Sequence, residues 1–82
     1  MSESDAIRLL TGALERLEVT LRSEPLPEEA PSAGGLCTLH GQPTLVLATD
    51  ASAASRIALM LDALRRLDTD GIWLPPAIRQ LL

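Results

Sequence analysis

Apolar residues near the start of the chain recur at spacings of three and four, which is the pattern of an amphipathic helix. They are Ile7, Leu10, Leu14, Leu17 and Leu21. The pattern predicts a helix over residues 5–18, with Ser2 or Ser4 as its cap. It is too short to specify a coiled coil, so we expect a helix that faces the core. Gly12 lowers helix stability by ~1 kcal/mol relative to alanine, and it would let another element cross closely.

Two short runs of β-prone residues follow a connection rich in proline and glutamate. Residues 19–22 have strand character, and residues 23–35 contain three prolines, three glutamates and two final glycines. This composition predicts a flexible, solvated connection, with a docking strip for another protein as the alternative.

Residues 36–40 and 44–48 flank Gly41-Gln42-Pro43 and predict a β-hairpin. Together with residues 19–22 they would form an antiparallel sheet of two or three strands. With a three-residue turn, alternate side chains of the two strands would lie on a common face of the sheet. This set is Cys37, Leu39, Leu45 and Leu47. The other face would then carry Thr38, His40, Thr44 and Val46.

A second helix is predicted from a cap at Asp50 or Ser52 to about Leu67. Its core stripe consists of Ala54, Ile57, Leu61 and Leu64. Four further apolar residues widen this stripe beyond what a small sheet can cover. They are Leu59, Met60, Ala63 and Leu67. We therefore expect part of this helix to face a partner.

The last segment places a tryptophan beside two prolines. Asp68-Thr69-Asp70-Gly71 ends the second helix, and Pro76 is suited to start a short helix that continues to Leu82. Ile78, Leu81 and Leu82 are expected to dock on the core or on a partner. Trp73 either closes the core or anchors an interface, and the aliphatic composition of the core favours the first. The predicted fold is α+β, one domain over residues 1–82.

Composition favours self-association. The chain has 82 residues, 46% of them hydrophobic, with one aromatic residue and one cysteine. Small domains bury little surface and commonly need a disulfide, a metal or oligomerisation. A single cysteine cannot form an internal disulfide, so we expect a homodimer.

Charge restricts the partners. The net charge is −4, and the positive charges are seven scattered arginines. This balance argues against nucleic-acid binding, which depends on neutralising phosphates. No apolar stretch approaches the ~20 residues that span a bilayer, and the acidic start is unlike a secretory signal. We expect a bacterial cytoplasmic protein whose partners include neither nucleic acid nor a membrane.

Candidate chemistry is sparse. Cys37 and His40 could contribute to a zinc site shared by two subunits, but strand residues three apart point to opposite faces. That geometry predicts a buried Cys37 and a polar His40 beside the turn. The stretch 68–71 matches only the start of a calcium loop, and a helix-ending turn explains the same residues without a metal. The two glycines at 34–35 precede a strand, unlike a phosphate loop. We assign no catalytic, cofactor or metal residues.

Two motifs carry a resemblance. Gly34-Gly35-Leu36-Cys37 begins a predicted strand, and Pro75-Pro76-Ala77-Ile78-Arg79-Gln80-Leu81 follows the tryptophan. From Gly34 to Leu81 the chain resembles short uncharacterised bacterial proteins with Gly-Gly-x-Cys and Pro-Pro-x-x-Arg-x-Leu segments, a resemblance that implies no known activity. The order strand then helix also resembles the opening of short zinc-peptidase domains, whose helix carries His-Glu-x-x-His. Residues 60–64 contain neither histidine nor glutamate, so no peptidase activity is implied.

The sequence therefore predicts a non-catalytic interaction module, a small cytoplasmic adaptor or regulatory subunit that forms a homodimer. The expected partner-binding residues are Leu59, Met60, Ala63, Leu67, Trp73, Leu81 and Leu82. The alternative is a metal-binding protein with an intersubunit site at Cys37 and His40. A hydrolase or transferase is a third, weaker option, because His40 and the carboxylates are the only bases that the sequence offers.

Overall fold

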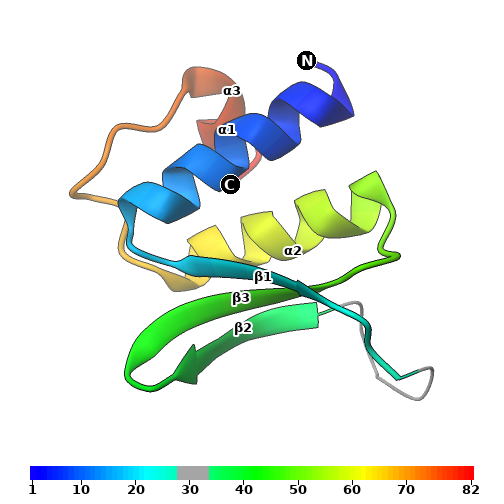
Figure 1. Ribbon diagram of the computed structural model, residues 1–82. Coiled ribbons are helices and arrows are strands. Elements are labelled where there is room, and N and C mark those ends of the chain that lie inside the picture. Colours follow the sequence, from blue (N-terminus) through cyan, green and yellow to red (C-terminus); the bar gives the residue numbers. More distant parts are fainter. Residues whose placement is uncertain (28–33) are drawn as a thin grey trace.

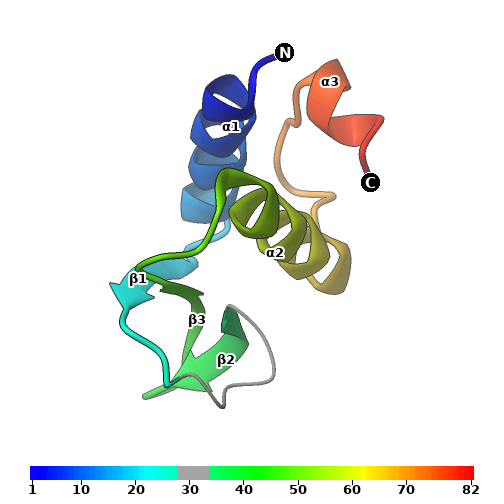
Figure 2. The same ribbon diagram turned by 90° about the vertical axis from the view of Figure 1, so that its right-hand side faces the viewer.

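The chain folds into a helical layer packed on one face of a three-stranded sheet (Figures 1 and 2). The computed structural model describes residues 1–27 and 34–82. Its elements in chain order are α1 (Glu3–Arg16), β1 (Thr20–Glu24), β2 (Gly34–Leu39), β3 (Gln42–Ala48), α2 (Ala53–Arg66) and α3 (Pro76–Arg79). The predicted α+β class and the order of its elements are confirmed.

The sheet is mixed, and the prediction of a purely antiparallel sheet is wrong. The strand order is β1-β3-β2, with β2 antiparallel and β1 parallel to β3. Glu24 at the end of β1 and Gly34 at the start of β2 lie on opposite sides of β3, beside Ala48 and Leu47. β1 and β2 are therefore the two outer strands and do not pair with each other. Of the predicted connection 23–35, both ends belong to strands and residues 28–33 lie outside the described residues.

The hairpin between β2 and β3 has a two-residue turn, one residue shorter than expected. His40 and Gly41 both have positive φ, 53° and 78°, as a type I′ turn requires. Leu39 is thus opposite Gln42, and Leu36 is opposite Leu45.

This register corrects the predicted faces of the hairpin. Leu36, Leu45 and Leu47 contribute to the core, whereas Cys37 pairs with Thr44 and shares the outer face with Leu39. A one-residue change in register exchanges the two faces of a strand, which explains why the prediction failed for Cys37 and Leu39.

Both ends of α1 have side-chain or backbone caps. The hydroxyl of Ser2 accepts a hydrogen bond of 3.1 Å from the Asp5 N–H. At the other end, the N–H groups of Glu18 and Val19 donate to the carbonyls of Glu15 and Leu14, which is a Schellman motif. Glu18 has a φ of 62°, and its carbonyl accepts a hydrogen bond from the Gln42 side chain. This motif ends the helix and directs the chain into β1.

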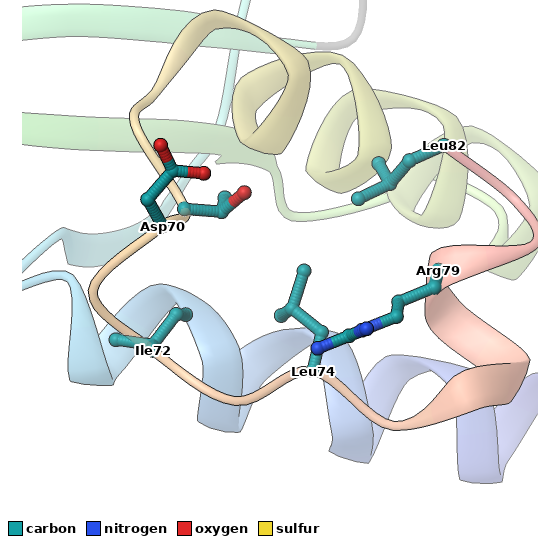
Figure 3. Close-up of a pocket in the computed structure, with 6 residues that line it drawn as sticks. Asp70, Ile72, Leu74, Arg79 and Leu82 are labelled. Atoms are coloured by element: carbon teal, nitrogen blue, oxygen red, sulfur yellow. The ribbon is translucent and has the colours of Figure 1, made fainter.

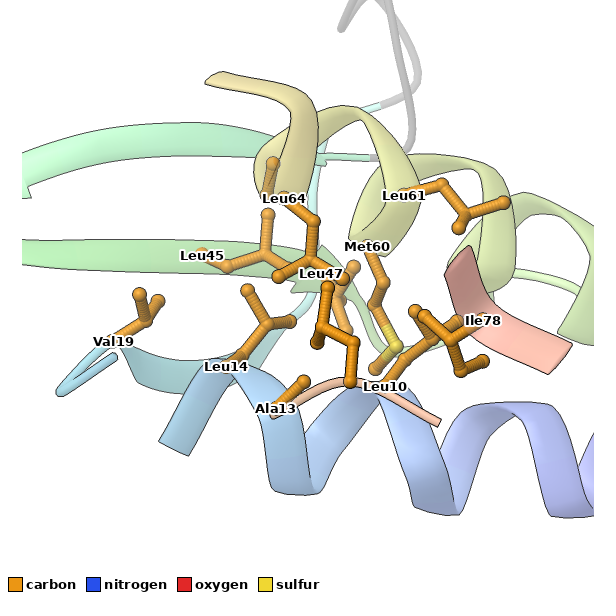
Figure 4. Packing of buried hydrophobic residues seen from close by; sticks show 12 residues of the cluster. Leu10, Ala13, Leu14, Val19, Leu45, Leu47, Met60, Leu61, Leu64 and Ile78 are labelled. Carbon is orange, nitrogen blue, oxygen red and sulfur yellow. The ribbon is translucent and has the colours of Figure 1, made fainter. Parts of the chain in front are cut away.

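The core lies between the sheet and the two long helices (Figure 4). Ser52 caps α2 through the Ser55 N–H at 3.1 Å, as predicted. Leu10 and Leu14 of α1 are fully buried, as are Leu45 of β3 and Ile78 of α3. Because α1 packs against α2 as well as against β1, α2 is covered from two sides. Along 1–27 and 34–82, no helix combines the length and the apolar character that a membrane crossing requires.

Two adjacent glycines of β2 allow a direct test of the strand pairing. We expect Gly34→Ala to destabilise the fold by about 2–3 kcal/mol, because Gly34 has a φ of 148° and an added Cβ would overlap the Val46 carbonyl. Gly35→Ala is the matched control, since its Cβ would meet no atom within 4 Å. Urea denaturation of both variants measures the difference. Equal midpoints would contradict the pairing of Gly34 beside β3.

Candidate interaction surface

Two of the predicted partner-binding residues belong to the chain's own core. Met60 is 3% exposed and Ala63 is fully buried. The prediction for these two residues is therefore wrong: neither side chain is available to a partner while the chain is folded. The sheet was expected to be the only cover of α2, whereas α1 packs on α2 as well. Leu59 and Leu67, in the same helix, are half-buried and pack against the core.

The tryptophan lies on the surface, although the aliphatic composition of the core favoured a place for it in the core. Trp73 is 61% exposed. Its backbone is nonetheless fixed, because Arg16 Nη1 donates a hydrogen bond of 3.1 Å to the Trp73 carbonyl. The next residue, Leu74, is buried, and Pro75 and Pro76 restrict the following backbone. A large aromatic side chain is thus presented to solvent from a rigid segment.

The two leucines after α3 are also exposed. Ile78 is fully buried and docks α3 on the core, as expected. Leu81 and Leu82 are 40% and 41% exposed, so part of each side chain is open to solvent. The Leu81 carbonyl accepts a hydrogen bond of 2.8 Å from Arg65 Nη2, which fixes the backbone beside α2.

Residues 72–75 separate two hollows. The first, which we call the C-terminal hollow, has a volume of about 340 Å³ (Figure 3). It is lined by Thr69, Asp70, Ile72, Leu74, Arg79 and Leu82. Asp70 and Arg79 reach it from opposite sides, with apolar side chains between them. The hollow therefore offers an apolar floor, one carboxylate and one guanidinium.

The second hollow, which we call the Trp73 hollow, has a volume of about 230 Å³ and lies against α1. Its α1 residues are Arg8, Leu9, Gly12, Ala13 and Arg16, and Trp73 and Pro75 complete it. Successive side chains of an extended segment point to opposite sides, so Ile72 and Leu74 face one hollow while Trp73 and Pro75 face the other. Arg8 and Arg16 were not among the predicted site residues, although their spacing of four from Gly12 is visible in the sequence.

The proposed metal ligands do not form a cluster. Cys37 is exposed on the outer face of β2, so the prediction of a buried cysteine is wrong. His40 is exposed in the turn that joins β2 to β3. Within the described ranges, no three residues of the types His, Cys, Asp and Glu come together in a way that could hold a metal ion.

Comparisons of the chain with protein-family models, with curated proteins and with solved structures give no match.

The exposure of Cys37 provides a test of the hairpin register. We expect a chromogenic thiol reagent to modify native protein within a few-fold of the rate for urea-unfolded protein, because the thiol is solvent-accessible. The Cys37→Ser variant gives the background rate. Protection of the native thiol by about 100-fold or more would indicate that Cys37 faces the core, as the longer turn predicted.

Proposed function

We propose that this chain is a non-catalytic protein–protein interaction module, a small cytoplasmic adaptor or regulatory subunit that forms a homodimer. One observation carries the proposal: within the described residues, the exposed large apolar side chains apart from Met1 are Trp73, Leu81 and Leu82. All three come from a ten-residue segment whose backbone is anchored to both long helices. Exposed apolar side chains on a fixed backbone are typical of binding surfaces, because little entropy is lost on association.

The C-terminal hollow is the surface best suited to a second copy of the chain. In a dimer with two-fold symmetry, both copies use the same surface patch. A residue on one side of the patch therefore contacts a residue from the other side of the patch on the second copy. Asp70 and Arg79 on opposite sides of this hollow would then pair across the interface, each with the other type on the second copy. Leu82 and Ile72 would supply the apolar contact between the two charged pairs.

Dimerisation would also compensate for the small apolar area that this core buries. A domain of ~80 residues buries a modest share of its surface, and aliphatic side chains contribute less area than aromatic ones. The single aromatic residue of this chain contributes little to the core, because it is exposed. Burying Leu81 and Leu82 between two copies would add apolar area without altering the fold of either copy.

Exchanging the charges of the hollow tests the proposed dimer. We expect wild-type protein to have twice the 8.8 kDa mass of one chain by light scattering. Asp70→Arg and Arg79→Asp should each be monomeric, because each variant places like charges opposite one another in its own dimer. An equimolar mixture of the two variants should recover the dimer, since the paired arginines of one variant then face the paired aspartates of the other.

In the same assay, two further variants distinguish the loss of apolar contact from the effect of an added charge. They are Leu82→Glu and Gln80→Glu. Both add one negative charge beside α3, but only Leu82 lines the hollow. We expect Leu82→Glu to weaken the dimer at least ~10-fold, which is about 1.4 kcal/mol, and Gln80→Glu to leave it nearly unchanged. A wild-type monomer at ~1 mM would reject the homodimer, and a mixture that stays monomeric would reject this hollow as its interface.

A further inference from the structure

The Trp73 hollow differs from the C-terminal hollow in its charge. Among the described residues, the two ionisable side chains that line it are both arginines, Arg8 and Arg16, although the chain carries a net charge of −4. Leu9, Ala13, Trp73 and Pro75 form the apolar part of its wall. The hollow is thus a local positive surface around an exposed tryptophan.

Arg8, Gly12 and Arg16 form one row along α1. They are spaced by four residues, so they lie on the same side of the helix, with the arginine backbones ~12 Å apart along its axis. Gly12 lies midway between them and leaves a gap in the row. A helix or side chain from another molecule could therefore approach the backbone of α1 closely at this point.

Packing within the chain gives no reason for a glycine at position 12. A Cβ built on Gly12 would meet no atom of the chain within 4 Å, and its backbone is ordinary α-helix. Glycine in the interior of a helix is unfavourable relative to alanine or glutamine. The fold would therefore tolerate a side chain here, and the empty space faces outward into the hollow.

Both arginines have N–H groups that could still bind a carboxylate of another molecule. Arg8 Nη2 lies 3.6 Å from Asp5 Oδ1, but both side chains are largely exposed, so the pair contributes little. Hydrogen bonds from Ser2, together with the nearby charge of Arg8, lower the pKa of Asp5. Arg16 uses one N–H for the Trp73 carbonyl, and a guanidinium has five donors.

A second copy of this chain does not suit the hollow. If two α1 helices crossed antiparallel at Gly12, Arg8 of each copy would face Arg16 of the other. In a parallel crossing, each arginine would face its own equivalent. Like charges opposite one another disfavour both arrangements, and carboxylates favour the hollow instead. Its volume of about 230 Å³ is also below the range of typical small-molecule sites and is closer to the space for a protein side chain.

We propose that the Trp73 hollow binds an acidic amphipathic helix of another protein, with an apolar side chain over Gly12 and carboxylates paired with Arg8 and Arg16. The carboxylates would lie about four residues before and four residues after the apolar side chain, because the arginines have that spacing around Gly12. This inference rests on the proposed interaction function and names a second partner, distinct from the other copy in the dimer.

A designed peptide provides the probe. An alanine-rich helical peptide with the segment Glu-Ala-Ala-Ala-Leu-Ala-Ala-Ala-Glu is titrated into wild-type protein, and a peptide with lysine at both glutamate positions is the control. Trp73 is the only tryptophan of the chain, so its fluorescence reports on the hollow, and the Gly12 amide resonance reports on α1. We expect the glutamate peptide to change both signals with a Kd of about 0.1–1 mM. The net charge of −4 would attract the lysine peptide, so a preference for glutamate must come from the local arginines.

Three variants locate the binding. Gly12→Gln should raise the thermal midpoint by about 4 °C, because glutamine is the better helix former, and yet weaken peptide binding at least ~10-fold by filling the hollow. Arg8→Gln should weaken binding ~3-fold or more. Arg66→Gln removes the same charge from the exposed side of α2, outside both hollows, and should leave binding unchanged. A rise in stability together with a loss of binding cannot be attributed to misfolding.

Several results would overturn the proposal. They are the absence of a signal at several millimolar glutamate peptide, equal binding of the lysine peptide, and wild-type affinity of the Gly12→Gln variant. Light scattering on the same samples keeps the two proposals separate. A monomer that binds the glutamate peptide would reject the homodimer and support this hollow as a binding site. A dimer that does not bind the peptide would support the homodimer and reject this hollow as a binding site.

Discussion

The two-residue turn at His40 and Gly41 decides which side chains of the hairpin reach the core. Its positive φ angles suit the right-handed twist of the strands that it joins, and they place Leu39 opposite Gln42. From that pairing, Leu36 falls opposite Leu45 on the side that the helices cover. One more residue in the turn would bring Cys37 and Leu39 under the helices and move Leu36 to the outer face. The apolar layer beneath α1 and α2 therefore depends on this turn.

The local elements could be predicted from the sequence because their signals are local. The spacing of Leu10 and Leu14 indicates a helix whatever covers it, and Ser52 caps α2 through a residue three positions away. The parallel pairing of β1 could not be predicted in this way. It depends on β1 and β2 occupying opposite sides of β3, a choice made by packing between residues far apart in the chain. Strand direction leaves no trace in a five-residue pattern.

The candidate surface was harder to predict than the fold. An apolar periodicity shows which residues avoid water, but it does not show which neighbour covers them. Met60 and Ala63 were therefore assigned to a partner, although α1 and the sheet cover both. Trp73 shows the opposite error. An aliphatic core suggested that the one aromatic side chain should fill it, yet Leu74 and Ile78 close that region and leave the tryptophan outside.

Residues 72–75 connect the proposed dimer to the proposed recognition of a second protein. Their extended backbone sends alternate side chains to the two hollows, so two of the four residues contribute to each hollow. A hollow with Asp70 and Arg79 can match its own copy under two-fold symmetry, whereas a hollow with Arg8 and Arg16 repels its own copy and attracts carboxylates. The distribution of charge can thus direct two kinds of partner to neighbouring surfaces. Anchoring of the segment by Arg16 and by buried Leu74 would let either surface bind without reordering the backbone first.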